Sequence, residues 1–500
     1  MSVSAVVGVD SSTQSCKVEF RELDGGRLLA RASAAHPPTE PPVSEQDPES
    51  WWQAFVRAFR RARAEAGAVR VEAISIAGQC HGFVPLDAAG RVIRPAKLWN
   101  DTTAAPELSA LVDEIGARRF VETTGSIPTA AFTIAKVAWL RAHEPQHFAR
   151  LRTILLPHDY LGYRLTGRYA TDRSDASGTG YFDPSRNAYR PEHLARIDDR
   201  ADWESMLPEV LPPDSSAGTV RAAAAEALGI GTDTVVGAGG GDQHASALGL
   251  GIEAGELVFS FGTSGVVVTT TPEPVRDLSG AVSGTADLTG GFLPLVCTLN
   301  AAKVTDTFAR LLGVDHTDLS RLALDADDDG PVLAAFLDGE RTPDRPHASG
   351  LLADLTPSAT REQLARAAVE GVVFGLVGGA TAISRLGCDT DGAVFAIGGG
   401  ARSEATVRLL AEALGRPVEL ARTAEPVARG AAVQAAAVRL GAEVARIGEA
   451  WRPAVDRSVS PRPGRAAARR YARYREVAAV TDLDAAAPRE SRDDATLLPR

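Results

Sequence analysis

Asp242 follows three consecutive glycines, Gly239 to Gly241, in the stretch GGGDQHAS. Glycine frees the backbone but packs nothing, so this run predicts either a flexible turn with an incidental acid or a backbone that approaches a ligand closely. In the second case Asp242 is a candidate general base, because an aspartate within hydrogen-bond reach can take the proton of an attacking hydroxyl. A helix N-cap is the structural alternative, since a helical run follows.

Two turns of small and hydroxyl residues could hold phosphate groups. VVGVDSSTQS (6–15) and VFSFGTSGVV (258–267) each place such a turn between two apolar strand-like runs. Backbone N–H groups and hydroxyls in such turns can bind an anion. One turn from each half of the chain could grip a polyphosphate across a cleft, although an ordinary hairpin explains either turn alone.

A third glycine cluster, IGGGARSEATVRLLAEALG (397–415), predicts a strand that ends at glycines and a helix that begins near Ser403. The glycines let a flat group lie against the backbone, and a helix N-terminus favours negative charge. The standard nucleotide fingerprints fail: GxxxxGK[ST] is absent, and GAGGGD has an aspartate where a dinucleotide loop needs its last glycine. If the chain binds a nucleotide, it must therefore use another architecture.

Hydrophobic periodicity predicts an α/β chain whose second half repeats the design of the first. AVVGVD, CKVEF and GRLLARASA predict antiparallel strands, followed by the helix WWQAFVRAFRRARAEAG and the buried strand VEAISIAG. TVVGAGGGD, ELVFSFGTSGVVVTT and VFAIGGGAR predict later strands, and GVVFGLVGGATAISRL, EATVRLLAEALG and RGAAVQAAAVRLG predict helices, the last of them buried. We expect a first domain over 1–248, a second over 249–484 and a disordered tail over 485–500.

Length and composition limit the class of protein. Five hundred residues exceed one ordinary hydrophobic core and predict two domains, and 44% hydrophobic with 23% charged residues is typical of globular proteins. A net charge of −11 argues against a nucleic-acid or anionic-membrane partner. No apolar run reaches the roughly 20 residues of a membrane helix, no leader is apparent, and four scattered cysteines without CxxC argue against disulfides or a zinc site. We expect a cytoplasmic protein.

Six stretches in collinear order resemble the FGGY carbohydrate kinases: VGVDSSTQSCKV, GQCHGFVPLDAAGRVIRPAKLWNDT, LPHDYLGYRLTGRYATDRSDASGTGYFD, VVGAGGGDQHASALGLG, FSFGTSG and IGGGARS. The resemblance covers about residues 4 to 480. It implies two actin-like, ribonuclease-H-like domains with an interdomain cleft, the sugar on the N-terminal side and MgATP mainly on the C-terminal side. GQCHG, LWND and GGGD favour a D-xylulose kinase, since glycerol kinases carry an Arg-Glu pair at Cys80-His81.

The resemblance implies that Asp242 is the catalytic base. Asp10 ends the first predicted strand, and a buried carboxylate beside a phosphate turn would repel the phosphates unless a cation lay between. We therefore expect Asp10 to bind Mg²⁺ through water. The alternative is that its carboxylate caps the turn by accepting a hydrogen bond from the Thr13 N–H. The expected phosphate contacts come from both halves: Ser12, Thr13, Ser15 and Lys17 in the first, Gly262 and Thr263 in the second.

Cys80 and His81 follow the strand ISIAGQ at its C-terminal end, where ligand sites of α/β proteins open. His81 can donate to and accept from sugar hydroxyls, although a structural histidine is the ordinary alternative. The other expected sugar contacts are Asp242, Gln243 and Trp99, with core packing an equal alternative for Trp99. Gln243 replaces a usual asparagine and Cys80 a frequent methionine, which leaves the fine sugar specificity open. The expected adenine site comprises Gly399, Gly400, Ala401 and Glu404, the last standing where relatives often have asparagine.

The resemblance thus implies ATP-dependent phosphorylation of D-xylulose to D-xylulose 5-phosphate, by a chain that can form a homodimer. The alternatives are a kinase of another ketose or polyol, such as ribulose or L-xylulose, and a catalytically silent sugar sensor on the same scaffold. A nicotinamide dehydrogenase is disfavoured by the failed dinucleotide fingerprint.

Overall fold

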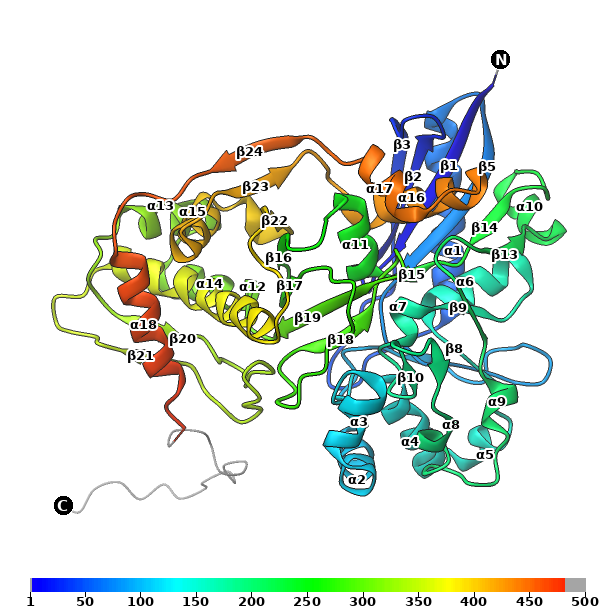
Figure 1. The fold of residues 1–500 in the computed structure, drawn as a ribbon, viewed down its shortest axis with the longest axis horizontal. Coiled ribbons are helices and arrows are strands. Elements are labelled where there is room, and N and C mark those ends of the chain that lie inside the picture. The colour runs from blue at the N-terminus through cyan, green and yellow to red at the C-terminus, as the bar shows by residue number, and fades with distance from the viewer. Residues whose placement is uncertain (1, 482–500) are drawn as a thin grey trace, which may run out of the picture.

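Two seven-stranded sheets organise residues 2–481, the part of the chain that this computed structural model describes (Figure 1). The first has the order β13-β14-β5-β1-β2-β3, with β15 also paired to β5. Its strands are β1 (Val3–Ser11), β2 (Ser15–Glu22), β3 (Leu28–Ala35), β5 (Val69–Gly78), β13 (Ser216–Thr219), β14 (Val235–Gly237) and β15 (Gly240–Gly241). The antiparallel hairpins β1-β2-β3 predicted from the sequence are confirmed.

The second sheet repeats this plan, with the order β18-β19-β17-β16-β22-β23-β24. Its strands are β16 (Leu257–Phe261), β17 (Gly265–Val268), β18 (Ser283–Ala286), β19 (Phe292–Thr298), β22 (Val394–Ile397), β23 (Val418–Ala421) and β24 (Val455–Val459). In both sheets the opening hairpin, β1-β2 or β16-β17, lies beside a parallel strand that arrives later in the chain, β5 or β22. The two predicted phosphate turns therefore occupy equivalent positions.

Helices cover both faces of the first sheet, because alternate residues of a strand point to opposite sides. Ala5, Val7 and Val9 of β1 enter the core formed with α1 (Pro48–Ala66). Val6 instead packs among residues of α16 (Pro426–Leu440), and a Cβ on Gly8 would lie 1.8 Å from the carbonyl oxygen of Ala428. Helix α16 is buried and rich in small residues, as predicted, and it packs on the first sheet although it lies between β23 and β24 of the second sheet in sequence.

Helix α11 (Asp242–Leu250) lies between the two sheets (Figure 1). Ala245 and Leu248 belong to the core cluster on the α16 side of the first sheet, whereas Ala247 and Leu250 pack with Val258 of β16. Gly249 and Gly430 let α11 and α16 touch, since a Cβ on Gly430 would lie 1.9 Å from the Ala245 carbonyl oxygen. The first residue of α11, Asp242, is thus anchored by packing from both lobes.

The second sheet encloses the larger hydrophobic core with α14 (Arg361–Arg385). By length and composition alone α14 could cross a membrane, so the expectation that no apolar run reaches that length is wrong. Because 72% of its apolar window is buried inside the structure, α14 is a core helix.

The remaining helices are α2 (Ala105–Ile115), α3 (Ala117–Thr124), α4 (Thr133–His143), α5 (Pro145–Phe148), α6 (Pro157–Thr166), α7 (Arg173–Ala176), α8 (Pro191–Leu194), α9 (Trp203–Met206), α10 (Ala222–Leu228), α12 (Ala302–Leu312), α13 (His316–Asp325), α15 (Glu404–Leu414), α17 (Val444–Ala450) and α18 (Ala466–Ala478). Short strands form β4 (Glu45–Gln46) with β7 (Ala96–Lys97), β6 (Val84–Leu86) with β8 (Thr153–Leu155), β9 (Ala170–Asp172) with β12 (Glu209–Leu211), β10 (Phe182–Asp183) with β11 (Ala188–Tyr189), and β20 (Val332–Ala334) with β21 (Leu351–Ala353). The tail expected over 485–500 lies outside the described residues.

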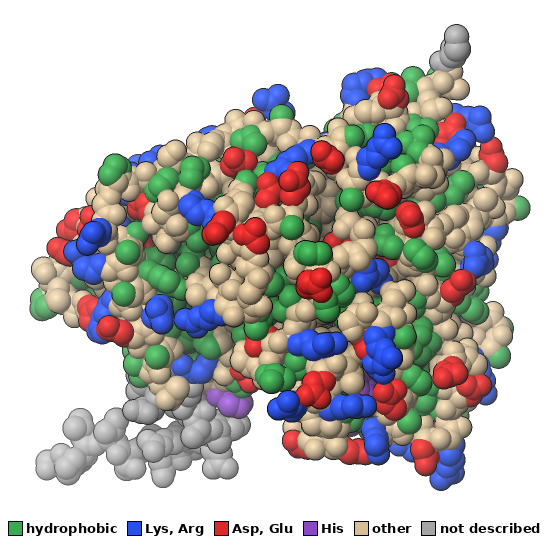
Figure 2. Space-filling view, viewed as in Figure 1, with side chains coloured by type: hydrophobic (Ala, Val, Ile, Leu, Met, Phe, Trp, Pro, Cys, Tyr) green, Lys and Arg blue, Asp and Glu red, His purple; other side chains and the backbone are tan. Residues whose placement is uncertain are grey.

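Acidic and basic side chains are interspersed over the face drawn in Figure 2, without a continuous patch of either sign.

Candidate active site

Strand register brings the predicted catalytic residues to one edge of the first sheet. Asp10 of β1 pairs with Ala77 of β5, and Gly240 of β15 pairs with Ala77 from the other side. All three strands run parallel, so their carboxyl ends coincide. Because neighbouring strands lie about 4.8 Å apart, the backbones at Asp10 and Gly240 are about 10 Å apart across β5. Cys80 and His81 leave the sheet at the same edge, immediately after β5.

Asp242 is the first residue of α11, and Gly241 is its N-cap. The carboxylate Oδ1 accepts a hydrogen bond from the N–H of Gln243 at 2.7 Å and one from the Cys80 thiol at 3.7 Å. Burial, together with the negative charges of Asp10 and Asp175, raises the pKa of Asp242 to about 7. A carboxylate with that pKa can accept a proton near neutral pH, as a general base requires.

The three glycines before Asp242 make room for other side chains of the protein. Gly239 has φ 83°, and a Cβ there would lie 2.6 Å from the His158 ring. A Cβ on Gly240 would lie 2.7 Å from Leu288, and one on Gly241 2.6 Å from the Cys80 sulfur. The loop is therefore tightly packed, and it is not a flexible turn.

Asp10 is buried at the first phosphate turn, with both carboxylate oxygens engaged. Oδ1 accepts a hydrogen bond from Ser12, and Oδ2 lies 3.3 Å from the ammonium of Lys17, which also pairs with Glu425 at 2.8 Å. Burial raises the pKa of Asp10, although Lys17 opposes this effect. The alternative role of Asp10, a cap of this turn through the Thr13 N–H, is not among its contacts within residues 2–481; the hydroxyl of Ser12 donates to the carboxylate instead.

Trp99 links the sugar side of the edge to the phosphate turn. Its half-buried indole donates a hydrogen bond from Nε1 to Thr13 Oγ1 at 2.8 Å. Ser15 begins β2, where it pairs with β3. Of the phosphate-turn residues, Ser12, Thr13, Ser15 and Lys17 are all partly exposed.

His81 is held in a single orientation and protonation state. Its φ of 66° is left-handed, its ring stacks on Phe132 at 4.9 Å, and Nδ1 lies 2.8 Å from the Gly178 carbonyl oxygen. A carbonyl only accepts, so Nδ1 carries the proton and Nε2 is the acceptor. Burial, with the nearby ammonium of Lys136, lowers the pKa of His81 to about 3. The ring is therefore neutral and can accept a hydrogen bond from a hydroxyl.

A buried ionic cluster that sequence reasoning missed supports these residues. His158 lies 3.0 Å from Asp159, 3.4 Å from Asp172 and 3.1 Å from Asp175. These carboxylates outweigh the effect of burial and raise the pKa of His158 well above its usual value. Asp175 in turn accepts a hydrogen bond from the backbone N–H of His81 at 3.1 Å. The stretches LPHDY and DRSDASG contain the cluster, but in the sequence they are distinguished only as parts of one of the six collinear motifs.

Gln434 is a second missed residue, and it comes from α16. Its Oε1 accepts a hydrogen bond from the Gly239 N–H at 2.9 Å, and its Nε2 donates to the Gly239 carbonyl at 3.0 Å. The same Oε1 accepts from Ser75 of β5. This bidentate amide fixes the backbone three residues before Asp242.

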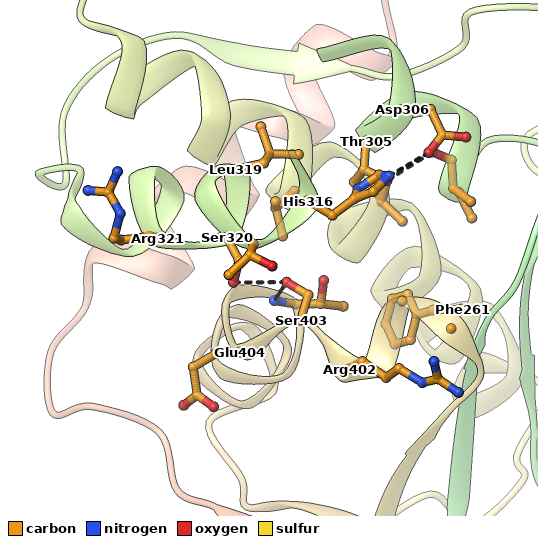
Figure 3. Close-up of a pocket in the computed structure, with 18 of the residues that line it drawn as sticks. Phe261, Thr305, Asp306, His316, Leu319, Ser320, Arg321, Arg402, Ser403 and Glu404 are labelled. Carbon is orange, nitrogen blue, oxygen red and sulfur yellow. Dashed lines mark hydrogen bonds and ion pairs between the residues drawn. The ribbon is translucent and has the colours of Figure 1, made fainter. Parts of the chain in front are cut away.

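The second lobe contains a cavity of about 880 Å³ between the ends of β16 and β22 and helices α12, α13 and α15 (Figure 3). Gly262, Thr263, Gly399, Gly400 and Glu404 line it, so the structure brings together predicted residues from two separate motifs. Phe261 and Leu319 give it apolar walls, while Ser320 and Ser403 face each other with oxygens 3.1 Å apart (Figure 3). Apolar walls with a few polar groups suit a flat heterocycle and a ribose.

Two predicted adenine-site residues differ from expectation in their surroundings. Ala401 is 5% exposed and belongs to the hydrophobic core, so it does not line the cavity as expected. Its neighbours Gly399 and Gly400 do line it, from the 3₁₀ helix η1 (Gly399–Arg402). Glu404 lines the cavity, but its carboxylate pairs with Arg408 at 3.0 Å and Arg457 at 2.6 Å, which lowers its pKa.

Two lobes of matching topology, with a carboxylate at the sheet edge of one and a nucleotide-sized cavity in the other, define a sugar kinase of the actin-like fold. Residues 5–249 match the N-terminal domain of the FGGY family of carbohydrate kinases, and residues 257–438 match its C-terminal domain. The chain belongs to this family, and it is a carbohydrate kinase with a sugar and ATP as substrates.

Named relatives agree with this assignment. The chain is 42% identical over 450 residues to a xylulose kinase of Streptomyces coelicolor, covering 90% of this chain and 91% of the relative. It is 43% identical over 451 residues to a xylulose kinase of Streptomyces rubiginosus, with the same coverage of both chains. The crystal structure of xylulose kinase from Bifidobacterium adolescentis superposes with a TM-score of 0.84 at 37% identity, covering 95% of this chain and 99% of the other.

Proposed function

We propose that this protein transfers the γ-phosphoryl group of ATP to D-xylulose and forms D-xylulose 5-phosphate. The observation that carries the proposal is the Asp242 carboxylate, whose pKa is about 7 and which lies at the same sheet edge as neutral His81. The choice of D-xylulose is supported by relatives at 42% and 43% identity that are named xylulose kinases.

In the proposed reaction the 5-hydroxyl of the sugar gives its proton to Asp242 while its oxygen bonds to the γ-phosphorus. The bond from that phosphorus to the β–γ bridging oxygen breaks, and ADP leaves with the bonding electrons. Proton removal by a positioned carboxylate contributes roughly 10²–10⁴-fold, and positioning supplies much of the remainder. Nε2 of His81 accepts a hydrogen bond from another sugar hydroxyl and so orients the ring or chain.

Phosphate contacts are proposed from both lobes, from Ser12, Thr13, Ser15 and Lys17 on one side and from Gly262 and Thr263 on the other. Thr263 is exposed at the β16-β17 turn, where its hydroxyl can reach a phosphate. Closing the cleft would exclude water, because Asp242 beside ATP would otherwise activate water and hydrolyse the nucleotide.

Mg²⁺ is proposed to arrive with ATP. Among residues 2–481 no group of three or more His, Cys, Asp or Glu side chains could hold a metal alone. A single carboxylate at a phosphate turn instead fits Mg²⁺, which is commonly bound by one or two carboxylates, substrate phosphates and water. Asp10 would hold it through water, and when bound it offsets negative charge on the phosphates. Lys17 forms ion pairs with both Asp10 and Glu425, and it can remain paired with Glu425 when Mg²⁺ occupies the position beside Asp10.

A panel of ketoses and polyols with coupled detection of ADP tests the substrate. Best turnover on any compound other than D-xylulose rejects the proposed sugar. Asp242→Ala should lose phosphorylation by several orders of magnitude while sugar binding changes less than about tenfold. Unchanged turnover in that variant would refute the base.

We also propose a division into domains 1–248 and 249–484, which is supported by family matches that end at 249 and resume at 257. A cytoplasmic location is proposed because the reaction consumes ATP. A homodimer is proposed from the family resemblance, and light scattering of the purified chain tests it.

A further inference from the structure

A separate cavity of about 310 Å³ lies where the β2-β3 hairpin meets segment 422–425. Through this segment the chain crosses from β23 of the second sheet to α16 on the first, two elements that Figure 1 labels. Its lining includes five arginines, Arg21, Arg27, Arg31, Arg422 and Arg429, but only one acidic residue, Glu19. None of these residues lines the cavity described above. The composition of this second cavity is opposite to the net charge of −11 of the whole chain.

The inner part of this arginine pocket contains more positive than negative charge. Arg21 and Glu19 are both buried and form a close pair, with Nη2 2.6 Å from Oε2. Arg429 reaches the same place from α16, where Nη2 donates to the Trp451 carbonyl but Nε is buried without a partner. The hydroxyl oxygen Oγ1 of Thr423 is a second buried polar atom without a hydrogen-bond partner. Buried charges are normally paired, and Arg429 has no ion pair within residues 2–481, so its charge is left for a ligand to neutralise.

The arginine side chains in the outer part of the pocket are exposed and can reorient toward a ligand. Arg31 stands directly across the β2-β3 pair from Glu19, so both side chains are on one face, and Arg31 has no ion pair or hydrogen-bonded partner within residues 2–481. Among the described residues, Arg27 pairs with Glu22 and Arg422 with Asp456, in exposed contacts that contribute little to stability.

We propose that the arginine pocket binds a phosphate-type oxyanion, either inorganic phosphate or the phosphate group of a small phosphomonoester. Guanidinium groups match phosphate oxygens with two parallel hydrogen bonds, so the five arginines of the lining suit a phosphate-type ligand. The unpartnered Arg429 Nε–H and the Thr423 hydroxyl supply two further hydrogen-bond donors.

The pocket is connected to the first phosphate turn through one strand face. Lys17, Glu19 and Arg21 are alternate residues of β2, so their side chains point to the same side, about 7 Å apart from one to the next. Lys17 joins Asp10 to Glu425, and Glu425 lies one helical turn before Arg429. An oxyanion in the pocket would therefore contact the first lobe and the interlobe segment at once. The pocket begins at Glu19, which lies two residues along β2 from Lys17, the partner of Asp10.

Isothermal titration tests the proposal, with inorganic phosphate added at constant ionic strength to the full chain saturated with ADP. The expected result is one site that weakens at least tenfold when Arg31→Ala and Arg422→Ala are combined. Both side chains are exposed, so the double variant should fold. The matched control is Arg385→Ala, an exposed arginine in the last turn of α14, which should bind phosphate as the unaltered chain does.

A second titration with a pentose 5-phosphate distinguishes the two sources of the oxyanion. Tighter binding of the monoester than of phosphate, lost in the double variant, identifies a phosphorylated metabolite as the ligand; the reverse order identifies inorganic phosphate. Binding at the sugar site is unaffected by Arg31 and Arg422 and would persist in the double variant. The proposal is overturned if neither compound binds, or if the double variant binds both as the unaltered chain does. It does not depend on which sugar is phosphorylated.

Discussion

Replacing Asp242 with asparagine should abolish catalysis and stabilise the nucleotide-free fold at pH 8. The pKa of Asp242 is raised to about 7 in the folded chain, chiefly by burial and then by Asp10 and Asp175. An unfolded aspartate titrates near 3.9, so the folded state binds this proton more tightly than the unfolded state does. Stability is therefore lost as the pH rises from about 4 through 7, because the unfolded chain releases this proton in that range while the folded chain retains it.

The size of the effect follows from the two pKa values. Relative to low pH, the titration of Asp242 lowers the unfolding free energy by about 4 kcal/mol at pH 8 and by about 1.5 kcal/mol at pH 5, as upper limits. Asparagine has the same shape, does not titrate and keeps an oxygen for the Gln243 N–H. Asp242→Asn should therefore unfold at a higher urea concentration than the unaltered chain, and by a larger margin at pH 8 than at pH 5.

Urea unfolding at pH 5, 6, 7 and 8 without nucleotide measures this margin, and a coupled ADP assay measures the activity. Asp214→Asn, at an exposed loop aspartate, is the matched control and should show no margin that changes with pH. A variant less stable than the unaltered chain at pH 8, or a margin independent of pH, would refute the account of Asp242 as a destabilised base.

The remaining predictions concern the same sheet edge. The kcat/KM for the sugar should fall as the pH drops below about 7, because protonated Asp242 cannot accept a proton, and a profile without an acidic limb contradicts this. Gln434→Leu should lower kcat at least tenfold with little change in the KM for ATP, because the amide that fixes Gly239 is lost. Gln434→Glu keeps the acceptor, so its kcat should lie between those of the unaltered chain and Gln434→Leu. Reduced stability at unchanged kcat would show a purely structural role. His81→Asn should raise the KM for the sugar about 10-fold or more, because the Nε2 acceptor is lost. The variant should fold, because asparagine tolerates the left-handed backbone at this position. An unchanged KM would exclude His81 from the sugar site.

Local sequence patterns predicted the parts of this protein that depend on neighbouring residues. The hairpins that carry the two phosphate turns, the strand before Cys80 and the helix that begins after Ser403 were all expected, because strand alternation and glycine turns are encoded within a few residues. The same reasoning misjudged α14, whose apolar run reflects burial inside the second lobe. It did not show that the Ala401 side chain belongs to the hydrophobic core while Gly399 and Gly400 line the cavity, because a residue in a glycine cluster can face either side.

The sequence by itself determined the chemistry available to this protein: a carboxylate after three glycines, hydroxyl-rich turns in both halves, and the family that combines them. Only the tertiary structure decided how that chemistry is tuned. Gln434 meets Gly239 across 195 residues, and Cys80 meets Asp242 across 162. Contacts between residues so distant leave no local pattern, since they arise when sheets and helices bury their apolar faces together. The raised pKa of Asp242 is a consequence of that burial, and the meeting of Arg422 and Arg429 with the arginines of β2 and β3 is a consequence of the same folding.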